Sequence, residues 1–413
     1  MFKSQQLIFS TGIALFLVIG AIIRSGASTI AFFLFLLSCF WLYQSKTKSE
    51  TMLNKSEKLW IWSIVLLNSV VLLSSYRDFS IDFSSIDALT RFLFAIPVYF
   101  LARKIGINLE IFFIGGAIGA IFMGGYAYYQ IEMLGYGQAV GMTDHNYFGQ
   151  LSLLLTFIAF VGLAYYSERK WRKYLFLLSS LVGLYAVTAA GSRGVWIALP
   201  ATAILVFKYS FPQVSWIKKI VGFLLFIMMI VSVYSTNTLQ VKNRVDSVVN
   251  QTVSFFQTGE VSGSAGLRLE MWRSSIIMIK DSYGLGAGDQ GYTNSMHTLI
   301  DQKRVHSRMK NFDVEPHNYY LKTFVGQGIM GITLLFMILG IPVNTLFKNL
   351  KNTRHKNTQF TAILGIGIIL CYIDFMISNT TLDVQLMSVF LGFTLFPLLG
   401  NFYYEKYQIK HET

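Results

Sequence analysis

The chain has 413 residues, of which 54% are hydrophobic and only 13% are charged. Because soluble globular proteins average about 25% charged residues, this composition excludes an ordinary soluble domain. A net charge of +13 would indicate a nucleic-acid partner in a soluble protein. In so apolar a chain the basic residues are instead expected to gather on the cytoplasmic side of a membrane. No nucleic-acid partner is expected.

Apolar runs of about 20 residues recur along the chain and predict an all-α polytopic membrane protein with about twelve transmembrane helices. The alternating polar and apolar pattern of a membrane β-barrel is absent. We expect one integral membrane domain across residues 1–413. The fourth predicted span is short, and Pro97 within it indicates a tilt or a break. The spans lie near residues 7–23, 27–44, 59–75, 88–102, 110–130, 148–166, 174–190, 194–208, 217–235, 318–346, 360–377 and 382–400.

The distribution of Lys and Arg predicts the orientation of these spans. If the N-terminus is cytoplasmic, 20 Lys and Arg residues fall in the inside segments. The short outside segments then carry only Arg24, Arg77, Arg91 and Arg193. Cytoplasmic loops of membrane proteins are enriched in basic residues, so both termini should be cytoplasmic. The first apolar run lacks a cleavage site in good order, and we interpret it as an uncleaved span.

One outside segment, residues 236–316, is far longer than the others, and we call it the long loop. Loops of this length are usually functional or separately folded. Two stretches in it, LQVKNRVDSVVNQTVSFFQTG and SAGLRLEMWRSSIIMIKDS, have apolar residues at helical spacing. They predict two amphipathic helices lying against the membrane surface. GLGAGDQGY, residues 284–292, then forms a glycine connector, and without a preceding strand it does not indicate a dinucleotide site.

Three ionisable residues lie on the predicted outer face: Arg193, Arg268 and His317. Arg193 lies between glycines where two spans join, and it either snorkels to the interface or points into an outward cavity. Arg268 is either a solvated charge on an amphipathic helix or part of a site. His317 follows a proline and is either a helix-capping residue or a proton acceptor.

Other polar residues on this face have equally ordinary alternatives. Asp144 and Asp383 stand near the outer ends of spans, where carboxylates often cap helices. Asn318 and the proline before His317 are expected to set the start of the next helix. Asp374 lies deeper and is expected to pair with a neighbouring polar group. The two cysteines fall inside apolar runs and are interpreted as buried small hydrophobic residues.

Taken together, the three residues indicate chemistry on a lipid-linked substrate. Guanidinium groups match phosphate oxygens in a bidentate manner, so two arginines suit a diphosphate. A histidine nearby suits general-base activation of a hydroxyl group. A site at the membrane surface then favours a transferase whose donor is a sugar on a lipid diphosphate.

Several motifs resemble the superfamily of O-antigen ligases and O-antigen polymerases. PHNYYLKTFVGQGIMG, residues 316–331, resembles its H-N-x-x-L…G-x-x-G signature. TAAGSRGVWIALP resembles its S-R-[GA]-x-W/L element, and SAGLRLEMWRSSIIMIKDSYGLGAGDQGY resembles its G-x-R-x-x-x-[WY] helix and the turn that follows it. MTDHNYFGQ matches the family's N-P-N-x-x-A element only loosely, because Asp144 and His145 replace the expected residues. The resemblance covers roughly residues 140–400.

The resemblance implies a bundle of about twelve transmembrane helices with a large periplasmic loop, in a bacterial inner membrane. It implies that His317 deprotonates an acceptor hydroxyl, and that Arg193 and Arg268 bind the diphosphate of an undecaprenyl-diphosphate-linked glycan. Asp383 resembles an acidic residue near the last outer loop, and Asp144 and Asn318 are possible supporting residues. The implied reaction is an inverting displacement that requires no metal and no cofactor.

The acceptor distinguishes the members of this superfamily. A ligase uses lipid A-core oligosaccharide, a polymerase uses another lipid-linked repeat unit, and a protein-directed relative uses a Ser or Thr hydroxyl. The arginine helix followed by the H-N motif resembles ligases most closely. The short tail after the last span is not what we expect of protein-directed members, in which an extra C-terminal region is common. A transporter of lipids or polysaccharides is a different class. It predicts a polar pathway near the midplane and often inverted repeats, and the sequence has no internal repeat.

Overall fold

A computed structural model describes most of the chain. It covers residues 2–23, 25–44, 52–77 and 83–210 without 167, 169 and 196, and then the isolated residues 215, 217 and 220. It further covers residues 241–288, 291–311, 315–350, 353 and 355–412. Every regular element among these residues is a helix, as the sequence predicts.

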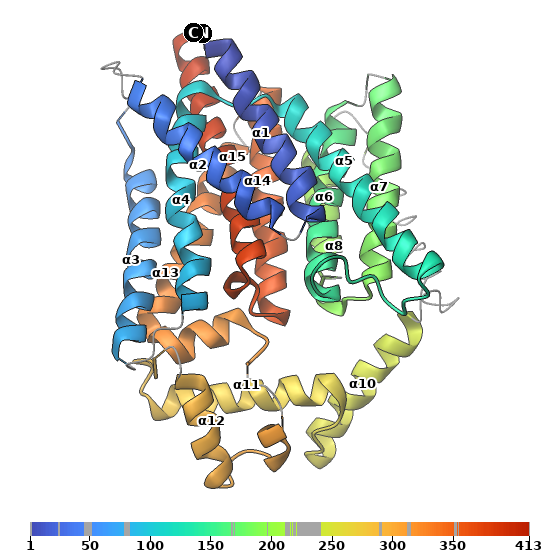
Figure 1. Ribbon diagram of the computed structural model, residues 1–413, viewed down its shortest axis with the longest axis vertical. Helices are drawn as coiled ribbons and strands as arrows, with labels where there is room; N and C mark the ends of the chain where they lie inside the picture. Colours follow the sequence, from blue (N-terminus) through green and yellow to red (C-terminus); the bar gives the residue numbers. More distant parts are fainter. Residues whose placement is uncertain are drawn as a thin grey trace.

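The helices form an upright bundle (Figure 1). Among the described residues, nine helices are long and apolar enough to cross a membrane, which confirms a polytopic membrane protein. The bundle consists of α1 (Phe2–Ile22), α2 (Gly26–Gln44), α3 (Lys55–Arg77), α4 (Phe83–Ile105), α5 (Leu109–Tyr128), α6 (His145–Tyr165), α7 (Lys170–Ala190), α8 (Ala198–Tyr209), α13 (Tyr319–Leu350), α14 (Lys356–Ser378) and α15 (Gln385–Glu412). Most residues of α6, α14 and α15 are buried within the protein, whereas α1 and α2 lie at its periphery.

Eleven of the twelve predicted spans coincide with these helices, although their ends differ. The predicted ninth span, 217–235, lies outside the described residues apart from 217 and 220. Of the tilt or break expected at Pro97, the break is wrong, because α4 continues through Pro97 and extends beyond the predicted span at both ends. The GSRG sequence between the seventh and eighth spans forms a short turn that includes a 3-10 segment, Arg193–Val195.

Glycines allow α5 to pack closely against its neighbours. A Cβ on Gly115 would lie 2.7 Å from the Ala14 Cα of α1, and a Cβ on Gly124 would lie 2.5 Å from the Val182 carbonyl oxygen of α7. Lipid tails are as apolar as the helices, so membrane helices associate through such close packing of small residues.

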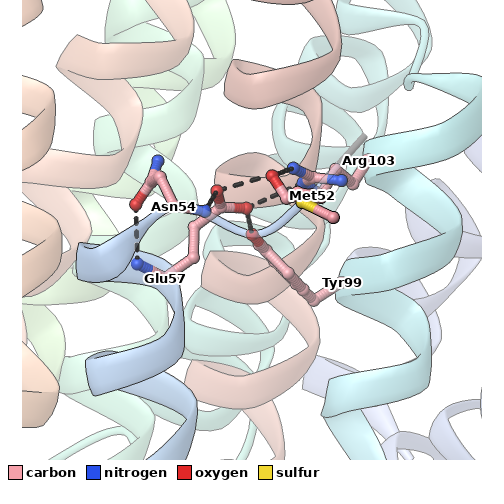
Figure 2. Close-up of polar contacts among 5 residues, drawn as sticks. All are labelled: Met52, Asn54, Glu57, Tyr99 and Arg103. Atoms are coloured by element: carbon pink, nitrogen blue, oxygen red, sulfur yellow. Dashed lines mark hydrogen bonds and ion pairs between the residues drawn. The ribbon is translucent and has the colours of Figure 1, made fainter. Parts of the chain in front are cut away.

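A polar cluster around the buried Glu57 carboxylate joins α3 to α4 near the end of the bundle that carries the termini (Figure 2). The Asn54 side chain accepts from the Glu57 amide at 2.9 Å, and the Asn54 amide donates to the Glu57 carboxylate at 3.0 Å. This reciprocal pair caps the helix start. Tyr99 and Arg103 donate to the same carboxylate, Arg103 Nε at 2.7 Å, and Arg103 also reaches the Met52 carbonyl at 3.4 Å. The hydrogen bonds drawn in Figure 2 serve the start of α3 and the packing of α3 against α4, so we assign this cluster a structural role.

The long loop contains three helices at the opposite end of the bundle from the termini (Figure 1). They are α10 (Val241–Thr258), α11 (Gly263–Asp281) and α12 (Gly291–Asp301). The sequence correctly predicts α10 and α11 but not α12. α11 lies across the end of the bundle, and α12 hangs below it.

The predicted tenth span is not one straight helix, because α13 breaks at Gly328, where φ is 66° and ψ is −161°. The break interrupts the backbone hydrogen bonding of the helix next to the Val325 and Gly326 carbonyls. The glycine connector satisfies both, because the Ala287 and Gly288 amides donate to them at 2.6 and 3.0 Å. In return, the Ile329 amide donates to the Gly284 carbonyl at 2.8 Å. The connector is therefore joined by its backbone to a membrane helix, and it holds the first part of α13 across the end of the bundle (Figure 1).

Candidate functional site

The candidate site is centred on the histidine loop, Glu315–Asn318, which leads into α13. His317 has a φ of 44°, a left-handed conformation that is uncommon outside glycine. Hydrogen bonds hold the loop on both sides of this residue. The Trp272 indole of α11 donates to the Pro316 carbonyl at 3.0 Å, and the Asn318 side chain accepts from the Leu321 amide at 3.0 Å and so caps α13.

The surroundings of His317 favour its neutral form. Burial, and then the positive charge of Arg268 on α11, hold the pKa of His317 below its ordinary value. The negative charges of Glu315 and Asp144 act in the opposite direction but do not cancel this effect. A neutral imidazole near physiological pH is the form that can accept a proton. Segments far apart in the sequence, at 144, 268 and 317, thus meet within electrostatic range.

Asp144 caps the α6 N-terminus, where its carboxylate accepts from the Asn146 amide at 2.8 Å and pairs with His145 Nδ1 at 3.0 Å. Burial would raise the pKa of Asp144, but the hydrogen bonds from His145 and the Asn146 amide outweigh it and lower the pKa to about 2. The capping role that the sequence left open is therefore present. The same carboxylate also lies close enough to His317 to influence its charge.

Arg193 lies in the turn between α7 and α8, and its backbone is beside the start of α6. Ser192 Oγ donates to the Asn146 side chain at 3.0 Å. A Cβ on Gly194 would overlap the Ser378 side chain at the end of α14. The turn thus reaches the same end of the bundle as Asp144, whereas the Arg193 side chain lies outside the described part of the structure.

Asp383 belongs to an ion network directly behind the histidine loop. Lys322 Nζ lies 2.7 Å from Asp383 Oδ2 and 3.3 Å from Glu315 Oε1. Thr380 Oγ1 donates to the other Glu315 oxygen at 2.8 Å. Burial would raise the pKa of Glu315, but the charge of Lys322 and these hydrogen bonds lower it overall. Lys322 is five residues after His317 in the sequence, and it pairs with both the Glu315 and the Asp383 carboxylates.

The sequence interpretation missed Lys322, Glu315 and Trp272. Lys322 could have been identified from the sequence, because it is a lysine inside the apolar run after His317 and charged residues at membrane depth are usually functional. Nothing in the sequence alone pairs Trp272 with Pro316. Lys322 and Asp383 also line a small cleft whose other walls come from α3, α4 and α13, namely Leu67, Val71, Leu89, Tyr319, Thr323 and Gln327.

Asp374, the deeper carboxylate, has a structural role. Its Oδ2 accepts from the Ala198 amide at 3.0 Å, at the first residue of α8. A carboxylate at a helix N-terminus satisfies a free amide and interacts favourably with the helix dipole. This agrees with the expected pairing to a neighbouring polar group.

A family model described as O-antigen ligase matches residues 176–336. This segment of the chain is therefore similar to O-antigen ligases. The matched segment contains Arg193, Arg268, Trp272, His317 and Lys322. Asp144 and Asp383 lie outside it. An uncharacterized protein of Haemophilus influenzae is 26% identical over 355 residues, covering 84% of this chain and 87% of that protein. The similarity therefore extends well beyond the matched O-antigen ligase segment.

Proposed function

We propose that this protein is an O-antigen ligase. It transfers a glycan from undecaprenyl diphosphate to a hydroxyl group of lipid A-core oligosaccharide. The observation that carries the proposal is the pair His317 and Arg268, in which burial and the nearby Arg268 charge lower the pKa of a histidine at the end of a membrane bundle. The match of residues 176–336 to the O-antigen ligase family model supports a lipid-linked glycan as the substrate class.

In the proposed reaction, His317 accepts the proton of the acceptor hydroxyl as its oxygen attacks the anomeric carbon of the donor. The bond between that carbon and the diphosphate oxygen breaks, and undecaprenyl diphosphate leaves with the bonding electrons. Arg268 and Arg193 stabilise the charge that develops on the leaving diphosphate, which preorganised cations do well. A single displacement of this kind inverts the anomeric centre, and neither a metal nor another cofactor takes part.

The remaining residues support the base rather than act on the substrate. Asn318 caps the helix that follows His317, and Asp144 adds a negative charge on the α6 side. Asp383 and Lys322 hold Glu315, which fixes the loop from behind. We place the site on the periplasmic face of a bacterial inner membrane, with residues 236–316 as a periplasmic loop and both termini in the cytoplasm. The basic residues of the short segments support this orientation.

Two close alternatives within the superfamily are an O-antigen polymerase and a protein O-oligosaccharyltransferase. A deletion strain distinguishes them. A ligase defect leaves long chains on the carrier lipid and none on the core, whereas a polymerase defect shortens the chains themselves. A protein-directed enzyme would leave the lipopolysaccharide unchanged. A transporter is less consistent with charged residues that gather at one end of the bundle, because transport sites lie near the midplane.

The substitution His317→Asn tests the proposed base without disturbing the backbone. Asn adopts left-handed φ values far more readily than most residues, so the loop should keep its shape. We expect at least about a 100-fold loss of glycan transfer, because general-base catalysis typically contributes that much or more. His297→Asn on α12 is the matched control and should retain activity, because His297 is exposed and distant from the histidine loop in the sequence. Normal transfer by His317→Asn protein that inserts normally would refute the proposed mechanism.

A further inference from the structure

The turn that ends α11 exposes two large side chains. Tyr283 is 91% exposed and Leu285 is 77% exposed. The turn is nevertheless well formed, because the Gly284 amide donates to the Ile279 carbonyl at 2.9 Å and the Leu285 amide donates to the Ser282 carbonyl at 3.0 Å. A fixed turn that presents an aromatic and an aliphatic side chain outward is typical of an interaction surface.

The position of this turn identifies what it contacts. The Gly284 carbonyl accepts from the Ile329 amide of α13 at 2.8 Å, so the turn adjoins the second part of that helix. Ile329 and Met330 are 58% and 54% exposed, and they lie in a helix apolar enough to cross a membrane. Exposed apolar residues on such a helix face lipid. Tyr283 and Leu285 therefore continue a lipid-facing surface into the long loop.

The charge beside the turn is consistent with this partner. Lys280 lies in the last turn of α11 and is exposed. A lysine next to an aromatic and an aliphatic residue matches the membrane interface, where ammonium groups meet lipid phosphates and tyrosine rings sit at headgroup level. Phe256 on α10 is also exposed, at 73%, but the hydrogen bond from the Ala265 amide to the Gln251 side chain joins α10 to α11 and not to a membrane span.

We propose that the Tyr283–Leu285 turn inserts into the lipid leaflet nearest the long loop and anchors the C-terminal end of α11 in the membrane. α11 is a continuous helix, so Arg268 lies about 22 Å along its axis from the anchored turn. The anchor therefore sets the position of Arg268 relative to the lipid headgroups. This inference needs only a membrane-embedded bundle and stands whether or not the protein is a ligase.

Lipid-borne quenchers test the anchor directly. Cys39→Ala removes the partly exposed native thiol, and Cys371 stays because it is fully buried. Single cysteines at Leu285→Cys and Thr298→Cys then carry an environment-sensitive NBD fluorophore in proteoliposomes of phosphatidylethanolamine and phosphatidylglycerol. Thr298 is exposed on α12, the helix that hangs farthest below the bundle, so it serves as the matched control (Figure 1).

We expect a blue-shifted emission for the label at 285 and strong quenching by phospholipids with a doxyl group near the headgroup. The label at 298 should emit as in water and resist quenching. Equal emission and equal quenching at the two positions would overturn the proposal. If a second copy of the chain covers the turn instead, the label at 285 escapes the lipid quencher and Leu285→Cys protein forms disulfide-linked dimers, which also overturns it.

Discussion

The backbone junction between the glycine connector and α13 gives the sharpest test of the fold near the site. Gly328 occupies a φ and ψ region that essentially only glycine adopts, and a side chain there costs about 1–3 kcal/mol in backbone strain alone. A Cβ at this position would also lie 2.5 Å from the Leu285 carbonyl carbon and 2.7 Å from the Gly284 oxygen. Both contacts are with backbone atoms, so no side-chain rotation can relieve the overlap.

We therefore expect Gly328→Ala to separate the connector from α13. Strain and overlap together should cost about 3 kcal/mol, and since each 1.4 kcal/mol is a factor of ten, local opening should become roughly 100-fold more frequent. Hydrogen exchange measured by mass spectrometry reads this at the Ile329 amide, which donates to Gly284 across the junction. Transfer activity should fall as well, because the histidine loop begins the same helix.

Gly340→Ala is the matched control on the same helix. A Cβ at Gly340 meets nothing within 4 Å, and the residue has ordinary helical geometry. Alanine there should leave exchange at Ile329 unchanged and improve helix stability by up to about 1 kcal/mol. If Gly328→Ala and Gly340→Ala show the same exchange at Ile329, the junction does not stabilise the loop and the reasoning is wrong.

Three further predictions concern the histidine loop. Trp272→Phe keeps the ring but loses the hydrogen bond to the Pro316 carbonyl, so turnover should fall about five- to tenfold at an unchanged KM for the donor, and a change in KM alone would contradict this role. Lys322→Met leaves two carboxylates without their cation and should destabilise the protein by about 2 kcal/mol in thermal unfolding, whereas Lys322→Arg should not; equal behaviour of the two variants would argue against the network. Glu315→Gln removes a negative charge that raises the pKa of His317, so the acidic limb of log kcat/KM against pH should move to lower pH, and a move to higher pH would contradict the assignment.

Hydropathy predicted most of the bundle because each span has to satisfy its backbone internally and cover itself with apolar side chains. The two features that it missed depend on other interactions. α12 has only 11 residues and a mixed composition, so its helix forms through packing against α11 and α13. The break in α13 lies inside a continuous apolar run, and it forms because the backbone of residues 284–288 replaces the hydrogen bonds of the helix.

The sequence predicted those residues of the candidate site whose side-chain type suggests a chemical role. It did not predict the contacts that depend on how the helices are arranged. His317 and Arg268 were singled out as ionisable residues of one face, and the structure brings them within electrostatic range. The sequence could not show that His317 has a left-handed backbone or that Trp272 holds the residue before it, because both depend on how α11 crosses the bundle. The proposed role of Arg193 stays a prediction.

The junction between the glycine connector and α13 also limits how this protein can be recombined with its relatives. A long loop between two membrane spans would ordinarily be expected to be exchangeable between relatives as a separate segment. Here its backbone supplies hydrogen bonds that α13 lacks, and Gly286 fits against Gly326 and Gly328 so closely that no Cβ is accommodated. A chimera that exchanges residues 241–311 alone would break this fit. A chimera that also exchanges residues 315–331 takes the glycine connector and the first part of α13 from the same protein. The smallest unit that can be transferred is therefore the long loop together with the start of α13.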